Sequence, residues 1–436
     1  MANELFFVIG LTILTGFVST LIFERTRISQ VLLLMLFGFI LGPALGIIDV
    51  SEGSVIVSIL PFISTLAMVV LLFDGGMSLD IFAVAKAIPK STLFSTVVFL
   101  FSTLLIGVFA VFAMGWPILQ GLLLGAVVGG TSSAIVIAMV EKTGIKDETK
   151  SLLTVESTLT DALSIIIAVI IVDFIVANQA LGVGDFFHLL LSSFTLALAV
   201  GVASALAWMF LVSHFKVKQF SYMLTLALVF GLFAVTEAIK GNGGFAVFVF
   251  GLMLGNVGEI DKFLKWDVHR PVGRTIKIFQ EEITFFVRTF FFVYMGLLLA
   301  PSYFSIPVLI IAVLLLVLMA AARYMSTRML LPDAPKRDRN IVMSMLPRGL
   351  AAAVLATLPL TRGIDIPFFR EIVFAVLLFT NIAGTAGVFI FDKPDEGEEE
   401  ESHEEKLTEA VKAAEKAEAK AEAKKKAEKK NDKKKS

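Results

Sequence analysis

The chain consists largely of apolar stretches that are long enough to cross a lipid bilayer. A transmembrane helix needs about 20 consecutive, mostly apolar residues. Hydrophobic residues make up 57% of the 436 positions, while charged residues make up only 17%. A soluble domain of this length does not have such a composition. The sequence therefore predicts an all-α polytopic membrane protein.

Hydropathy predicts 13 transmembrane helices. They cover residues 4–23, 30–48, 54–73, 91–114, 117–140, 150–177, 185–212, 219–239, 243–257, 278–300, 304–330, 339–361 and 366–391. Lysine and arginine gather on every second connection, whereas the opposite connections contain only Lys240, Arg362 and Arg370. Because basic loops stay in the cytoplasm, we expect a multi-pass protein of the cell membrane with its N-terminus outside and its C-terminal tail inside.

Four ionisable residues interrupt these apolar stretches: Glu156, Asp161, Arg323 and Arg348. A charge at the centre of a membrane helix costs about 2.5–3.5 kcal/mol even on a lenient insertion scale. Such side chains usually face a charged partner or an aqueous cavity. They indicate the functional site.

The fifth and twelfth spans contain helix breakers at matching places. Gly129-Gly130-Thr131-Ser132-Ser133 and Pro347-Arg348-Gly349 are each followed by small residues and an apolar half-helix. Paired breaks of this kind are typical of inverted-repeat transporters, whose site lies at the midplane of the membrane. Spans four to six would then recur, inverted, as spans eleven to thirteen. The alternative is that Gly and Pro are simply frequent in membrane helices.

The sixth span carries the chemistry in the run Glu156-Ser157-Thr158-Leu159-Thr160-Asp161-Ala162. Ser157 and Asp161 lie one helical turn apart on one face, with Glu156 and Thr160 on the neighbouring face. A small cation needs hard oxygen donors in place of water. We expect Asp161, Ser157 and the opened backbone around Thr131 and Ser132 to provide them.

A buried carboxylate can hold either a proton or a cation, because burial favours its neutral form and a bound cation favours its charged form. Competition for Asp161 would then couple cation movement to proton movement. The alternative is that Asp161 forms a structural ion pair with an arginine. Glu156 is instead expected to pair with Arg323, which leaves Asp161 free.

Two further charged residues have expected roles. Arg348 lies beside the second break, where it would balance the partial negative charge of converging helix ends. Asp74 follows the third span, where it could line a cytoplasmic funnel or be a solvated loop residue.

These residues resemble the monovalent cation:proton antiporter superfamily, especially its NhaP and sodium/proton exchanger branch. The run 156–162 resembles that family's Glu-Ser-x-x-Asn-Asp motif. Supporting matches are Leu71–Met77, Thr236-Glu237 with Gly243–Ala246, Gly251 and Gly255, Phe291–Gly296, and Arg348–Ala351. The likeness covers residues from about 5 to 390.

The resemblance implies an NhaA/NhaP-like homodimer with two discontinuous crossing helices and elevator-type exchange of a cation for H⁺. It implies a core domain of residues 91–180 and 301–391, a dimer or scaffold domain of residues 1–90 and 181–300, and a charged tail at 392–436. In the family, the residues matching Asp161, Ser157 and Thr131 bind the cation, and those matching Glu156 and Arg323 form an ion pair.

Two departures from the family pattern affect the transported ion. Thr160 replaces the Asn or Asp of relatives, so only one free carboxylate remains and electroneutral 1:1 exchange is favoured. Ser132 replaces an Asp and is closer to the potassium-efflux branch. We expect Na⁺, with Li⁺ tolerated, and a role in pH homeostasis. K⁺/H⁺ exchange and sodium-coupled symport of an organic anion are the alternatives.

Other classes of protein lack support in the sequence. There is no cysteine, and the four histidines have no metal-ligand spacing. We therefore expect no enzymatic activity, no cofactor and no nucleic-acid partner. A channel would need a continuous polar pore instead of one occluding site. The tail is rich in Ala, Glu and Lys, which predicts a disordered or fraying helical extension, with a regulatory role as the alternative.

Overall fold

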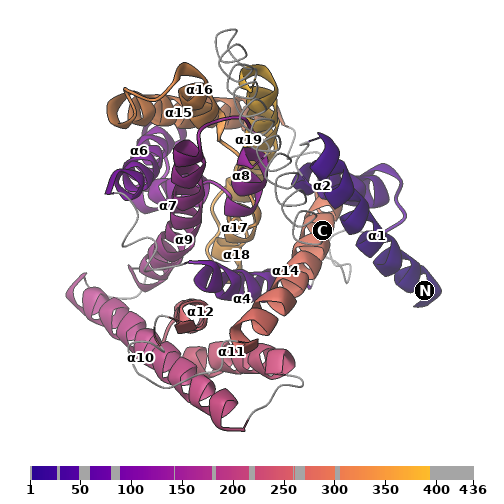
Figure 1. Cartoon of the computed structure of the whole chain (residues 1–436), viewed down its shortest axis with the longest axis vertical. Coiled ribbons are helices and arrows are strands. Elements are labelled where there is room, and N and C mark those ends of the chain that lie inside the picture. The colour runs from indigo at the N-terminus through magenta and orange to yellow at the C-terminus, as the bar shows by residue number, and fades with distance from the viewer. Residues whose placement is uncertain are drawn as a thin grey trace, which may run out of the picture.

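The computed structural model describes residues 2–26, 30–48, 59–79, 89–141, 143–178, 183–215, 221–258, 260, 271–299 and 305–392. These residues form helices and no strand (Figure 1). The charged tail expected after Asp392 lies outside the described residues. The helices are α1 (Ala2–Thr26), α2 (Gln30–Phe39), η1 (Ile40–Ala44), α4 (Leu60–Ser78), α6 (Pro89–Met114), α7 (Ile118–Gly129), α8 (Ser133–Val140), α9 (Asp147–Asn178), α10 (Val183–Phe215), α11 (Ser221–Ala238), α12 (Gly243–Gly255), α14 (Pro271–Leu297), α15 (Ile306–Leu330), α16 (Lys336–Ser344), α17 (Leu350–Leu355), α18 (Leu358–Thr361) and α19 (Phe369–Phe391).

Six of the described stretches are long and apolar enough to cross a membrane. They are Lys90–Met114, Ile118–Val140, Asp147–Val176, Leu191–Leu211, Ile306–Leu330 and Phe369–Phe391. Five more apolar helices are shorter: Ile9–Phe23, Gln30–Ala44, Phe62–Ser78, Tyr222–Ala238 and Gly243–Gly255. The all-helical prediction is therefore confirmed. The total of 13 spans and the inverted repeat stay predictions.

The helices pack in two neighbouring groups. One group contains α6, α7, α9, α15, α16 and α19, where α7 packs between α6 and α9 and where α15 packs on α6 and α19. It occupies the upper left of Figure 1. In the other group, α4 packs on α12 and α14, α12 on α10, and α14 on α2. The short α17 contacts both α4 and α9, so it lies where the two groups meet.

Glycines bring α12 and α4 into close contact. A Cβ atom on Gly251 would collide with the carbonyl oxygen of Phe73, and one on Gly255 with that of Met77. Small residues spaced four apart allow such close approach between membrane helices. This glycine pair therefore serves a contact within the chain. α4 also extends beyond the predicted end of the third span at residue 73, so Asp74 lies inside a helix and not after it.

Candidate ion-binding site

Two interrupted helices cross at the centre of the molecule. α7 ends at Gly129, and α8 begins at Ser133 after a short extended segment. α16 ends at Ser344, and α17 begins at Leu350 after five non-helical residues. The backbone N–H of Ser132 in the first break donates a hydrogen bond to the carbonyl oxygen of Pro347 in the second, at 3.0 Å. The two breaks are thus joined directly, and each satisfies a backbone group that the other helix leaves free.

Glycine allows this crossing to be tight. A Cβ atom on Gly349 would collide with the side chain of Ser132, and one on Gly130 would collide with the carbonyl oxygen of Thr160 on α9. Both breaks therefore depend on a residue without a side chain at the point of closest approach. The first break is pressed against α9 at the level of its polar run.

Arg348 neutralises the carbonyl oxygens that the breaks expose. Its guanidinium donates to the carbonyls of Val128, Gly129 and Leu346, of which the Leu346 contact is 2.8 Å long. The first two carbonyls end α7, so the charge lies where the partial negative charge of that helix collects. Arg348 is only 2% exposed. Arg348 thus lies at the second break and contacts carbonyl oxygens of both broken segments, while its charge-balancing role stays a prediction.

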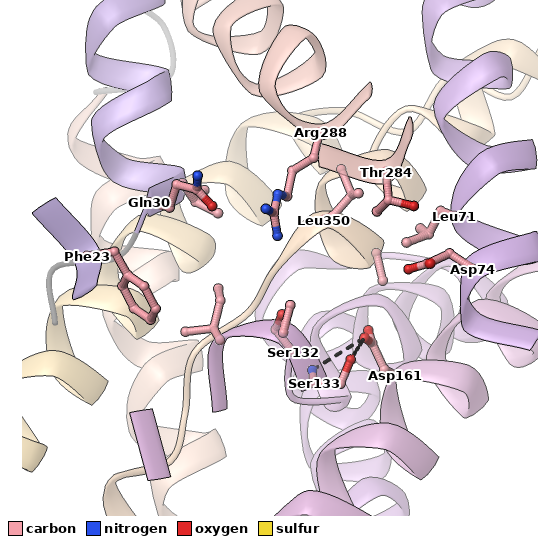
Figure 2. Close-up of a pocket in the computed structure, with 14 residues that line it drawn as sticks. Phe23, Gln30, Leu71, Asp74, Ser132, Ser133, Asp161, Thr284, Arg288 and Leu350 are labelled. Atoms are coloured by element: carbon pink, nitrogen blue, oxygen red, sulfur yellow. Dashed lines mark hydrogen bonds between the residues drawn. The ribbon is translucent and has the colours of Figure 1, made fainter. Parts of the chain in front are cut away.

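Asp161 faces the start of the half-helix α8. The hydroxyl of Ser133 donates to Asp161 Oδ2 at 2.9 Å, and the backbone N–H of Ser133 points to the same oxygen at 3.4 Å (Figure 2). Both donors belong to the first residue after the break. Sequence reasoning named Ser132 but missed Ser133, although Ser133 is the residue at which the apolar half-helix begins.

Glu156 lies five residues before Asp161 and has entirely different neighbours. Its two carboxylate oxygens accept hydrogen bonds from Arg323 Nη1 at 3.0 Å and Nη2 at 2.8 Å. The hydroxyl of Thr131 adds a third bond at 3.0 Å. Both charged side chains are at most 1% exposed. Glu156 and Arg323 therefore form a buried, bidentate ion pair, and the acid has no contact with the cavity that Asp161 lines.

Three other predicted site residues, Thr131, Thr160 and Ser157, form hydrogen bonds within the first break and α9. The backbone N–H of Thr131 donates to the hydroxyl of Thr160 at 3.1 Å, which ties the first break to α9. Ser157 is fully buried, and its hydroxyl donates to the carbonyl oxygen of Thr154 in its own helix at 3.2 Å. In this arrangement Ser132 lines the cavity together with Asp161, while Thr131, Thr160 and Ser157 support the backbone.

A cavity of about 80 Å³ opens onto Asp161. α4 contributes Asp74, which accepts a hydrogen bond from the hydroxyl of Thr284 on α14. α14 also contributes Arg288, a residue that sequence reasoning did not place at the site. Figure 2 shows the two acids on the same side of this cavity, with Arg288 pointing into it from above. The cavity thus joins the crossing of the broken helices to residues of the other helix group.

Residues 10–393 match the model described as the transmembrane sodium/hydrogen exchanger. The chain belongs to this family. Its described helices also match the structure of the sodium proton antiporter MjNhaP1 from Methanocaldococcus jannaschii at pH 8, with a TM-score of 0.69 and 21% sequence identity over 89% of this chain and 98% of the other. The resemblance drawn from the sequence is confirmed, and the fold is that of the antiporter.

Two curated relatives carry different ion names. The K(+)/H(+) antiporter NhaP of Alkalimonas amylolytica is 26% identical over 385 residues, which are 86% of this chain and 64% of the relative. The probable Na(+)/H(+) antiporter 2 of Methanocaldococcus jannaschii is 26% identical over 392 residues, which are 86% of this chain and 89% of the relative. This chain therefore spans somewhat less than two thirds of the first relative and most of the second.

Proposed function

We propose that this protein is a cation/proton antiporter that exchanges Na⁺ or Li⁺ for H⁺ with 1:1 stoichiometry. The observation that carries the proposal is the difference in surroundings between Glu156 and Asp161, the two acids in the polar run of α9. Glu156 is neutralised by Arg323, whereas Asp161 faces a cavity and is held by one serine. One titratable carboxylate can hold one proton or one monovalent cation, but not both.

The crossing supplies further ligands for a cation. Ser132 and Ser133 line the same cavity as Asp161, and the breaks leave backbone groups near them without helical partners. When a cation binds, the hydroxyl of Ser133 can turn its oxygen toward the ion in place of donating its hydrogen to Asp161. Thr131, Thr160 and Ser157 act in this scheme by holding the backbone in place.

The packing of the helices in two groups supports a proposal for alternating access. In our proposal, residues 91–180 and 301–391 form a core that carries the ion, and residues 1–90 and 181–300 form the scaffold of a homodimer. The core moves past the scaffold in an elevator-type step, with the N-terminus outside, the C-terminal tail in the cytoplasm, and pH homeostasis as the result. The cavity lined by residues of both groups supports this division.

K⁺/H⁺ exchange is the second candidate function. The name of the relative from Alkalimonas amylolytica favours it, as does Ser132, a neutral residue beside the crossing. The two candidates share the same site and differ only in the size of ion that it accepts.

Purified protein in proteoliposomes tests the proposal. Na⁺, Li⁺ or K⁺ added singly should dissipate an imposed proton gradient, reported by a pH-sensitive dye, without any organic solute. Asp161→Asn should abolish this exchange, because an amide holds neither a proton nor a cation in place of the carboxylate. Asp333→Asn, a matched change at an exposed aspartate, should retain it. Cation-dependent proton flux in Asp161→Asn would overturn the assignment, and a requirement for an organic anion would favour the symporter.

A further inference from the structure

Arg288 is a charged side chain in the cavity that the exchange scheme does not use. It projects from α14 and lines the same space as Asp74 and Asp161, and Figure 2 shows its guanidinium directed into that space. Its Nε is buried, and among the described residues no hydrogen-bond acceptor meets it. Burying such a donor without a partner is costly. If the Arg288 side chain served packing alone, we would expect its Nε–H to have a hydrogen-bond acceptor.

The other two membrane arginines are already engaged. Arg323 binds Glu156, and Arg348 binds carbonyl oxygens at the helix breaks. Within the part of the chain that the structure describes, Arg288 is therefore the positive charge that lines the cavity. It interacts electrostatically with Asp74, which in turn is influenced by Asp161. Glu281 on α14 is a further acid that acts on Asp74, from an exposed position.

The net charge of the cavity lining indicates a role for Arg288. With both acids ionised, Asp74 and Asp161 contribute two negative charges to the cavity lining and Arg288 contributes one positive charge, which leaves a net charge of one negative. One monovalent cation neutralises it. Without Arg288 the lining would carry two negative charges and would attract cations more strongly, because charge interactions are larger in a partly buried site than in water.

We propose that Arg288 is a specificity-determining residue, an inference that rests on the proposed exchange function. Its tethered positive charge competes with the transported cation for electrostatic interaction with Asp74 and Asp161. It keeps cation affinity low enough for release from the cavity. The positive charge of Arg288 repels a divalent cation more strongly than a monovalent one. It therefore also favours monovalent over divalent cations.

The experiment compares Arg288→Gln, Arg288→Lys and the parent in proteoliposomes at alkaline pH, where protons compete least. Arg328→Gln, at an exposed arginine of α15, is the matched control. We expect Arg288→Gln to lower the half-saturating Na⁺ concentration by at least roughly threefold to tenfold, which is the effect of a single charge interaction of the strength found in bulk water. Arg288→Lys and Arg328→Gln should stay close to the parent. The maximal rate of Arg288→Gln should not rise, since tighter binding slows release.

Two further measurements keep the test decisive. If Arg288→Gln transports too slowly to measure, the Na⁺ concentration that half-maximally raises its melting temperature in detergent should still fall relative to the parent. In an Asp74→Asn background, the effect of Arg288→Gln should shrink, because neighbouring charges are not additive. An unchanged or higher half-saturating concentration would overturn the role of Arg288. Absence of cation-dependent flux in the parent would instead overturn the exchange function itself.

Discussion

At the scale of single residues, the protein gives two acids of one helix opposite tasks. Glu156 and Asp161 are separated by little more than one turn of α9, so they face different neighbours. A guanidinium fixes the charge of Glu156 in a bidentate pair. Among the described residues, the hydrogen-bond donors to Asp161 are the hydroxyl and amide of Ser133, which a cation or a proton could displace. In the proposed mechanism, the environment of each acid, more than its residue type, decides that Asp161 and not Glu156 exchanges its partner.

Ser133 and Ser157 can be told apart by experiment. Ser133→Ala removes a donor and a potential ligand at Asp161, so we expect the half-saturating Na⁺ concentration to rise roughly twofold to tenfold, as for loss of one hydrogen bond. Ser157→Ala is the matched control, because its hydroxyl bonds within α9. Titration of Na⁺-dependent proton flux measures both. A larger effect in Ser157→Ala would return the ligand role to the residue that the family motif implies.

The Glu156 and Arg323 pair should contribute to stability. Glu156→Gln leaves a buried guanidinium without its counter-charge, a change that typically costs about 3–5 kcal/mol. We expect a lower melting temperature in detergent, followed by loss of tryptophan fluorescence or by size exclusion after heating. The double variant Glu156→Leu/Arg323→Met, which removes both charges, should recover part of the loss. Equal melting of Glu156→Gln and the parent would contradict a structural role for the pair.

The sequence predicted these residues unequally well. Glu156, Asp161, Arg323 and Arg348 could be found because an ionisable group is costly in an apolar span and so stands out. Ser133 could not be distinguished from Ser132, because an extended segment does not reveal which of two serines will begin the next helix. Arg288 was not predicted at the site, because residue 288 simply falls within the span 278–300 and the sequence does not show that α14 begins at Pro271 and brings this residue to the cavity.

At the scale of elements, the crossing of the two broken helices depends on close backbone approach. Breaks were predictable from Gly and Pro in apolar spans, because both weaken the helix. Their contact was not, since no local pattern shows that residues 132 and 347 will meet. The structure supplies that contact as a backbone hydrogen bond of 3.0 Å.

Gly349→Ala should disrupt the crossing. The added methyl group would overlap the side chain of Ser132, so the two segments must separate. We expect a lower melting temperature and reduced exchange. Gly231→Ala, at a helical glycine with open space around its Cβ position, should behave like the parent. Adding Ser132→Gly to Gly349→Ala should restore the melting temperature, and failure of this rescue would argue that the overlap is not the cause.

At the scale of the whole molecule, the charge carried by the cavity decides how exchange should respond to the membrane potential. Among the described residues, the charged side chains that line the cavity are Asp74, Asp161 and Arg288, while Glu156 is paired with Arg323. Loading the site with one Na⁺ or one proton changes the net charge by the same amount. The two loaded forms therefore respond equally to an electric field across the membrane.

Exchange should accordingly be insensitive to membrane potential. A gradient of the permeant anion thiocyanate can impose a potential of either sign across proteoliposomes without adding a competing alkali cation. We expect the initial rate of Na⁺/H⁺ exchange to stay the same, because moving one charge inward for each charge moved outward does no net electrical work. A rate that rises with one polarity and falls with the other would show that unequal charges are exchanged.

The hydrogen bond between the two breaks has a mechanical consequence. Because Ser132 and Pro347 are linked to each other, neither half-helix can shift alone without giving up a buried backbone bond. A bound ion need not be passed from ligand to ligand during transport. In the proposed elevator step, we therefore expect the linked pair of broken helices to move as one unit with its bound ion, over a distance that the packing of the neighbouring helices limits.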